Sequence, residues 1–157
     1  MDEKKYRVDG KIALVLGGAG DIGKAIAESL SAAGAKTVIL SSRKQENLDK
    51  AAQEIKGKTG GDVVGIASHL GKLDQIQALV DKLKADYGRI DILVNSSGSS
   101  FMVDLVDVEE WQWDNVMNVN LKGPFFLARE IAKMMKEQGG GSIINITSYM
   151  GIRVEQS

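Results

Sequence analysis

The chain of 157 residues carries 20 Lys and Arg against 21 Asp and Glu, and 43% of its residues are hydrophobic. This length and balance are typical of one folded domain with a buried core and exclude a disordered, highly charged tail. A net charge of −1 argues against nucleic acid as a partner, and the absence of Cys with only one His excludes disulfides and a Cys- or His-rich metal centre.

The N-terminal residues are charged, and the apolar runs are only as long as a strand. We therefore expect no export signal, no membrane partner and a cytoplasmic location. No repeat or linker interrupts the sequence, which predicts a single domain over residues 1–157.

Apolar strands and amphipathic helices alternate along the chain. The expected strands are 12–16, 37–40, 62–67, 90–94 and 142–146, and the expected helices are 21–33, 44–58, 73–87 and 113–137, the last bent near Gly123. Strands separated by helices pair in parallel through right-handed crossovers. The sequence therefore predicts an α/β fold, a doubly wound parallel sheet of the Rossmann type, with a ligand at the carboxyl ends of its strands.

A glycine-rich turn joins the first expected strand to the first expected helix, with the sequence Gly17-Gly18-Ala19-Gly20-Asp21-Ile22-Gly23. Glycines allow a sharp turn and close approach of a pyrophosphate, and the free amides at a helix start attract anions. The pattern predicts a dinucleotide site; the alternative is a tight turn that binds nothing. We expect the Asp21 carboxylate to face solvent, because it would repel a diphosphate.

The end of the second strand indicates which dinucleotide is bound. In nicotinamide-binding folds an acid roughly 20 residues after the glycines bonds the ribose 2′-hydroxyl, whereas an arginine accommodates a 2′-phosphate. This chain has Ser42 and Arg43 there and no acid. A hydroxyl with a guanidinium favours NADP(H) over NAD(H) as the cofactor. The alternative is that Arg43 is a solvated residue at the start of a helix.

Five motifs, in the same order, resemble those of the short-chain dehydrogenase/reductase family. They are Asp9-Gly10-Lys11, the glycine turn, Asn95-Ser96-Ser97-Gly98, Asn118-Val119-Asn120-Leu121-Lys122-Gly123 after Trp113, and Gly141-Ser142-Ile143-Ile144-Asn145-Ile146-Thr147-Ser148. The resemblance extends from Asp9 to the end of the chain, which would be the N-terminal portion of such a domain.

The resemblance implies a reaction and a set of site residues. The implied catalytic residues are Ser148, which would bond the substrate oxygen, and Asn120, which would hold a water for proton transfer. The implied cofactor-binding residues are Gly17, Gly20, Ile22, Gly23, Ser42, Arg43, Leu70, Asn95 and Gly98. The implied reaction is hydride transfer between the nicotinamide cofactor and a small-molecule carbonyl or secondary alcohol, with no metal.

The sequence departs from the family at several positions. Leu16 and Asp21 stand where the family's turn usually has Thr and Gly. His69 stands where the family has an Asp that meets adenine, so His69 either contacts adenine or is an exposed structural histidine. The loop from Ser99 to Asp107 is expected on the substrate side.

The family's proton donor, the tyrosine of a Tyr-x-x-x-Lys motif, is missing from residues 1–157. Tyr149 and Arg153 have similar spacing, but Tyr149 lies directly beside Ser148 at a strand end, so we interpret the pair as non-catalytic. We expect little or no activity from this chain alone. Alternatives are a non-catalytic dinucleotide-binding or partner-binding module and a Rossmann-like methyltransferase, against which the missing acid after the second strand argues.

The domain is expected to be incomplete at its C-terminal edge. The fifth strand would then be an uncovered edge, and the long helix would expose an apolar face. That face would comprise Val116, Val119, Phe125, Phe126, Ile131, Met134 and Met135. Because exposed edges and apolar patches promote association, we expect a homo-oligomer or a second polypeptide that completes the domain.

Overall fold

The protein is described by a computed structural model that places residues 6–149. Its centre is a five-stranded parallel sheet with the strand order β3-β2-β1-β4-β5. The strands are β1 (Ile12–Leu16), β2 (Thr37–Ser42), β3 (Val63–Ala67), β4 (Ile92–Asn95) and β5 (Ser142–Asn145). The expectation of a doubly wound α/β sheet is confirmed.

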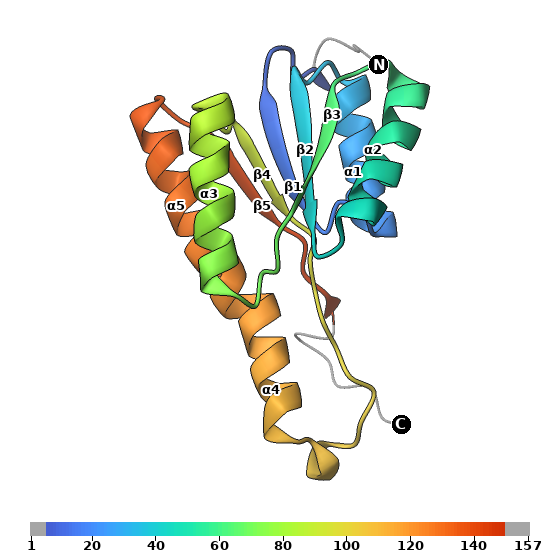
Figure 1. Ribbon diagram of the computed structural model, residues 1–157, viewed down its shortest axis with the longest axis vertical. Helices are drawn as coiled ribbons and strands as arrows, with labels where there is room; N and C mark the ends of the chain where they lie inside the picture. Colours follow the sequence, from blue (N-terminus) through green and yellow to red (C-terminus); the bar gives the residue numbers. More distant parts are fainter. Residues whose placement is uncertain (1–5, 150–157) are drawn as a thin grey trace.

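Helices cover both faces of the sheet (Figure 1). Helices α1 (Asp21–Ala32) and α2 (Gln45–Thr59) lie on one face, and α3 (Leu73–Tyr87) and α5 (Gly123–Glu137) lie on the other. Helix α4 (Glu110–Met117) extends past the carboxyl ends of the strands, away from the sheet. None of the helices in the described part of the chain is long and apolar enough to cross a membrane.

Strand β1 is buried on both faces of the sheet. Every residue from Ile12 to Leu16 is apolar and at most 4% exposed. Successive side chains of a strand point to opposite faces. Leu14 and Leu16 therefore pack into the core beneath α3 and α5, and Val15 packs into the core beneath α1 and α2. A continuous apolar run is the pattern of a strand that is buried on both faces.

The apolar side of the last helix is only partly exposed. Ile131, Met134 and Met135 are at most 5% exposed and belong to the core on the α3 side of the sheet, so our expectation that they form an exposed face was wrong. Residues spaced three, four and seven apart share one helical face, and here that face lies on the sheet. Phe125 does remain 62% exposed. The expectation for the fifth strand is confirmed, because β5 is an edge strand with all four residues exposed.

The long helix expected over 113–137 is divided into three parts. A π-helical turn, η3 (Asn118–Lys122), separates α4 from α5. Gly123, at the start of α5, packs on the β3–α3 connection so closely that a Cβ there would lie 1.9 Å from the Leu70 carbonyl oxygen. A side chain at this position would separate the two segments, which is why the junction requires glycine.

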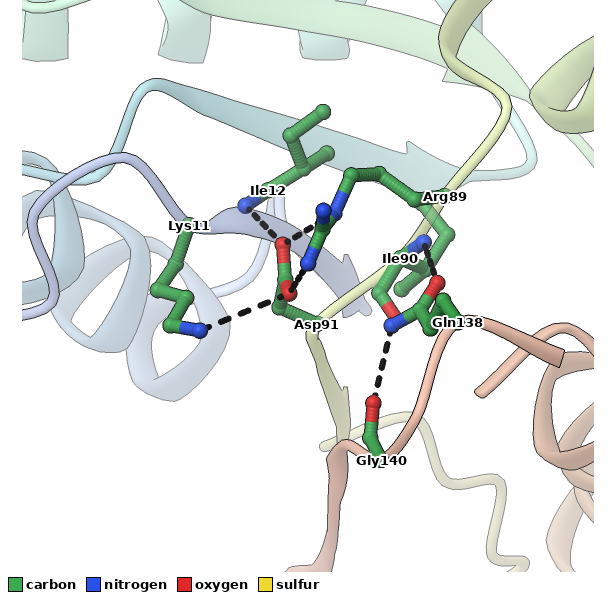
Figure 2. A network of polar contacts seen from close by, with 7 residues as sticks. All are labelled: Lys11, Ile12, Arg89, Ile90, Asp91, Gln138 and Gly140. Atoms are coloured by element: carbon green, nitrogen blue, oxygen red, sulfur yellow. Dashed lines mark hydrogen bonds and ion pairs between the residues drawn. The ribbon is translucent and has the colours of Figure 1, made fainter. Parts of the chain in front are cut away.

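A buried carboxylate organises the amino ends of the strands (Figure 2). Asp91 is 5% exposed and accepts the Ile12 N–H at 2.9 Å and the Arg89 guanidinium at 2.5 Å. The Lys11 ammonium lies 3.7 Å away. Burial alone raises the pKa of Asp91, but the hydrogen bonds from Arg89 and Ile12 and the two nearby positive charges outweigh it and lower the pKa.

A second side chain joins the end of α5 to the same region. The Gln138 amide donates to the carbonyls of Ile90 at 2.8 Å and Gly140 at 2.9 Å, and it accepts the Ile90 N–H at 3.2 Å (Figure 2). The start of β5 is held by the Ser142 N–H, which donates to the Asp91 carbonyl. Together these contacts fix β1, β4, α5 and β5 to one another at the end of the sheet opposite its carboxyl edge.

Candidate functional site

A cavity of about 450 Å³ lies at the carboxyl ends of β1, β2, β3 and β4. Its walls come from the segment that follows each strand, together with one side of α4 and η3. The lining residues are Gly17, Ala19, Gly20, Ser41, Ser42, Arg43, Lys44, Asn47, Ser68, His69, Leu70, Ser96, Ser97, Gly98, Ser99, Asn115 and Val119. The point between β1 and β4, where the chain changes direction, is the position at which open α/β sheets bind ligands.

The floor of the cavity is a tight turn in which Gly17, Gly18 and Gly23 leave no room for a side chain. Gly17 has φ +73°, a conformation that favours glycine. A Cβ on Gly23 would lie 2.3 Å from the Gly17 carbonyl oxygen, and a Cβ on Gly18 would lie 2.9 Å from Leu40 Cβ. The Gly17 N–H is anchored to the Ser41 carbonyl at 2.8 Å, so the turn is fixed against β2.

The turn leads into the start of α1 without a capping side chain. Gly20 is the N-cap residue, and no side chain accepts a hydrogen bond from the first turn. The free amides and the positive end of the helix are therefore available to an anion. Asp21 is exposed and does not line the cavity, as expected. The Ile22 side chain is 61% exposed, and Ile22, a predicted cofactor contact, does not line the cavity.

The β2 end of the cavity is positively charged. Ser42, Arg43 and Lys44 line it, and no Asp or Glu of residues 6–149 does. Arg43 and Lys44 are both exposed at the start of α2. This end of the cavity can therefore hold an anionic group, and it offers no carboxylate to accept hydrogen bonds from ribose hydroxyls.

The β4 end contains hydroxyl and amide groups. The Ser96 hydroxyl donates to the Leu16 carbonyl at 2.6 Å and so holds the segment after β4 against β1. The Asn95 amide donates to Asn145 Oδ1 over a long 3.5 Å, whereas Asn95 Oδ1 is buried and accepts no hydrogen bond within residues 6–149. Asn95 itself does not line the cavity.

Asn120 is tied to the loop after β4. Its Oδ1 accepts the Ser99 N–H at 2.7 Å, and its Nδ2 donates to the Ser99 carbonyl at 2.8 Å. Asn120 lies in the π-helical turn and does not itself line the cavity, but Ser99 does. Each amide atom keeps a second hydrogen-bonding position, so a water can still bind to Asn120.

The structure brings most of the predicted residues to one site. Of the predicted cofactor contacts, those in the cavity lining are Gly17, Gly20, Ser42, Arg43, Leu70 and Gly98. The predicted contacts Ile22, Gly23 and Asn95 are not among the lining residues. Ser148 is exposed in the segment after β5 and does not line the cavity, and Arg153 lies outside the described residues.

Several lining residues were not predicted. Lys44, Asn47 and Ser68 carry no motif, and Asn115 and Val119 reach the cavity only because α4 extends past the sheet. The spacing of four between Asn115 and Val119, which places them on one helical face, was the available signal. No group of Asp, Glu and His in the described part of the chain is arranged to hold a metal.

Comparison with known proteins gives the family. The profile described as short chain dehydrogenase matches residues 11–156. The chain belongs to the short-chain dehydrogenase family. Its members are oxidoreductases, and the match includes the glycine turn, the whole β1–β5 sheet and the segment that carries Asn120.

Individual relatives match about equally well and act on different substrates. The chain is 40% identical over 146 residues to the 3-oxoacyl-(acyl-carrier-protein) reductase FabG of Thermotoga maritima, covering 93% of this chain and 58% of that protein. It is 36% identical to an NAD-dependent glycerol dehydrogenase of Listeria innocua, and the match covers 96% of this chain and 57% of that protein. The L-sorbose reductase of Gluconobacter frateurii, solved with NADPH and L-sorbose, superposes with a TM-score of 0.88 at 29% identity. This match covers 97% of this chain and 56% of the reductase. The chain thus spans little more than half the length of these short-chain dehydrogenases.

The cavity fits a nicotinamide dinucleotide, the class of cofactor that this family binds. The glycine turn packs Gly18 against Leu40 and Gly23 against the Gly17 carbonyl, and it leads directly to the uncapped start of α1. The cavity volume is within the usual range for small-molecule sites, roughly 300–1,000 Å³. When bound, the cofactor supplies or accepts the hydride, and the protein supplies orientation and proton transfer.

Proposed function

We propose that this chain is the cofactor-binding part of an NADP(H)-preferring oxidoreductase that acts on a carbonyl or secondary alcohol of a small molecule. The observation that carries the proposal is the combination of a tight glycine-rich turn with an uncapped helix start at the floor of one cavity. Both features favour a diphosphate, because backbone N–H groups can approach it without obstruction.

The preference for NADP(H) rests on the charge at the β2 end. Arg43 and Lys44 line the cavity, and no carboxylate does. A 2′-phosphate gains charge-assisted hydrogen bonds from such a pair, whereas a ribose 2′-hydroxyl finds no carboxylate to accept its hydrogen bond. The relatives do not decide this point, since one is NAD-dependent and another was solved with NADPH.

We assign Asn120 and Ser148 to the reacting end of the site. The Asn120 amide holds the Ser99 loop at two points, which fixes the cavity wall beside the reacting groups. A water on its remaining positions would pass a proton to or from solvent. Ser148, exposed after β5, would donate a hydrogen bond to the substrate oxygen as negative charge develops on it.

The sequence from Met1 to Ser157 lacks the family's usual acid. No tyrosine is followed by Lys four positions later, and Tyr149 is 58% exposed beside Ser148. General acid–base catalysis contributes about 10²–10⁴-fold to rate. We therefore propose that these 157 residues alone bind the cofactor but turn over slowly, and that a turnover number ordinary for a reductase, measured on chain of verified mass, would contradict this.

Association with further copies is also part of the proposal. The segment around α4 exposes large apolar side chains that water would not favour. These residues are Met102, Leu105, Val106, Trp111, Trp113 and Phe125. We propose a homo-oligomer, and sedimentation of a monodisperse monomer at micromolar concentration would count against it.

The test of the proposed cofactor is calorimetric titration of the chain with NADPH and with NADH. We expect NADPH to bind more tightly. Arg43→Ala should weaken NADPH binding by at least about tenfold, because it removes a charge-assisted hydrogen bond, and should change NADH binding little. Lys50→Ala is the matched control, since it removes a positive charge from an exposed position of α2 that does not line the cavity. Equal effects of Arg43→Ala on both cofactors would refute the assignment.

A further inference from the structure

A second cavity, of about 420 Å³, lies at the amino ends of β1, β4 and β5, at the opposite end of the sheet from the first cavity, whose floor is the glycine turn. Its walls come from the residues before β1, from the start of β4 and from the connection between α5 and β5. Three basic residues line it, Arg7, Lys11 and Arg89, together with the acidic Asp91. No other charged side chain of residues 6–149 lines this second cavity.

We propose that the second cavity binds a small inorganic oxyanion, with phosphate as the type. Three observations carry the proposal: a positive charge that the fold does not need, hydrogen-bond donors that the fold leaves unused, and a wall made of main chain. The proposed function does not use this region, so either proposal can fail without the other.

The carboxylate in the second cavity is already neutralised. Asp91 is 5% exposed, and its Oδ2 accepts the Ile12 N–H at 2.9 Å and Arg89 Nε at 3.2 Å. Its Oδ1 accepts Arg89 Nη2 at 2.5 Å (Figure 2). Because this two-point contact compensates the charge of Asp91, an anion in the cavity meets an ion pair instead of a free carboxylate.

Lys11 therefore contributes a surplus positive charge. Its ammonium lies 3.7 Å from Asp91 Oδ1, which is too far for a hydrogen bond, and its side chain is 50% exposed. Within residues 6–149 the Lys11 ammonium makes no hydrogen bond, and neither does Arg89 Nη1. Arg7 adds little net charge, because it binds the Asp9 carboxylate at 2.6 Å.

The end of α5 does not require these donors. The carbonyls of Met134, Met135 and Lys136, in the last turn of α5, accept the main-chain N–H groups of residues 138–140. The helix end is thus capped by its own chain. The ammonium of Lys11 and the free edge of Arg89 remain available to a ligand.

The wall between α5 and β5 is made of three glycines. Gly139 and Gly140 have φ +91° and +140°, which favour glycine, and a Cβ on Gly141 would lie 2.5 Å from the buried Met135 side chain. Gly141 and Ser142 both line the second cavity. Within residues 6–149 the Gly141 N–H and the Ser142 hydroxyl make no hydrogen bond, so this wall offers two further donors.

Phosphate suits this set of donors. Guanidinium and ammonium groups bind its oxygens through charge-assisted hydrogen bonds, and at neutral pH it carries more negative charge than a monocarboxylate such as acetate. The cations are about half exposed, so salt screens them and the affinity is modest. We expect a dissociation constant for phosphate of about 1–5 mM.

The test is a titration of the isotope-labelled chain with sodium phosphate near neutral pH, at an ionic strength held constant with NaCl, followed by amide NMR shifts. The Gly141 amide reports the second cavity. The Gly20 amide reports the first cavity, where the uncapped start of α1 can also attract phosphate. We expect the Gly141 shift to saturate with phosphate and not to saturate with acetate.

Variants of Lys11 identify the cation. Lys11→Gln should weaken phosphate binding at Gly141 by at least about fivefold, whereas Lys11→Arg, which keeps the charge, should stay within about twofold of the parent. Lys36→Gln is the matched control. Lys36 is exposed and directly precedes β2, as Lys11 precedes β1, but it does not line the second cavity, so phosphate binding should change less than about twofold.

Three results would overturn the proposal. They are the lack of a saturable Gly141 shift up to about 50 mM phosphate, saturable shifts confined to Gly20, and equal weakening by Lys11→Gln and Lys36→Gln, which would reflect general attraction to a charged surface. Each of these results would leave the proposed function intact, because NADPH binding is measured separately.

Discussion

Replacement of Asp91 by Ala should cost about 2 kcal/mol of folding free energy. The Ile12 N–H is buried at the start of β1 and loses its acceptor, and an unsatisfied buried donor costs roughly 1–3 kcal/mol. Arg89 and Lys11 add little, because their side chains are 48% and 50% exposed and are rehydrated when the carboxylate is removed. For a chain of this length, the loss lowers the thermal midpoint by about 4–8 °C.

The assay is urea unfolding followed by far-ultraviolet circular dichroism at neutral pH. Asp91→Asn keeps an acceptor for the Ile12 N–H and should lose less than half as much stability as Asp91→Ala. Asp9→Ala is the matched control: Asp9 also accepts from an arginine two residues earlier, but both side chains are exposed, so no measurable change is expected. If Asp91→Ala were as stable as Asp9→Ala, the assignment of Asp91 as a structural anchor would be refuted.

The pH dependence provides a second check on Asp91. Its pKa is lowered in the folded protein, so the folded state binds its proton less readily than the unfolded state. The stability from this group is therefore fully present above the ordinary Asp value, about 3.9, and is lost as pH falls through the folded-state pKa. The difference in free energy of unfolding between the parent and Asp91→Ala should be constant from pH 7 to pH 5 and should narrow below about pH 4. A stability difference that widened as the pH fell would contradict a lowered pKa for Asp91.

Two further predictions concern the cavity. Gly23→Ala places a Cβ 2.3 Å from the Gly17 carbonyl oxygen, so the turn must shift and the NADPH dissociation constant should rise at least about tenfold by calorimetry. Gly57→Ala, at an open position of α2, should leave that constant unchanged and stabilise the fold by about 0.5–1 kcal/mol; equal NADPH affinity in the two variants would contradict the role of the turn. Asn120→Ala removes both hydrogen bonds to Ser99 and should cost about 1 kcal/mol in urea unfolding and increase amide exchange at Ser99. Unchanged exchange there would show that the loop is held by other contacts.

Local patterns in the sequence were sufficient for the strands and for the tight glycine turn. The apolar run from Ile12 to Leu16 and the glycines after it are consecutive in the chain, so periodicity and turn chemistry determine them directly. The position of Arg43 followed from counting along the chain, because the length of α1 is fixed by its start and by the glycine after it.

Features that depend on distant packing were not predictable in this way. The Asp91 carboxylate bonds an amide 79 positions earlier, and no spacing rule connects residues so far apart. The π-helical turn at 118–122 arises where Gly123 must fit against the Leu70 carbonyl, a contact between two separate crossovers. Ile131 was expected to be exposed because the sequence shows which residues share a helical face but not what that face covers.

The two ends of the sheet differ: one carries buried polar contacts and the other carries the first cavity. The carboxylate and amide contacts of Asp91 and Gln138 gather where the strands begin, whereas the hollow over the glycines opens where they finish, a strand length of about 17 Å away. The first cavity and the contacts that stabilise the fold therefore lie at opposite ends of the same strands. Substitutions around Asp91 and Gln138 can therefore change the stability of the fold without altering a residue that lines the first cavity.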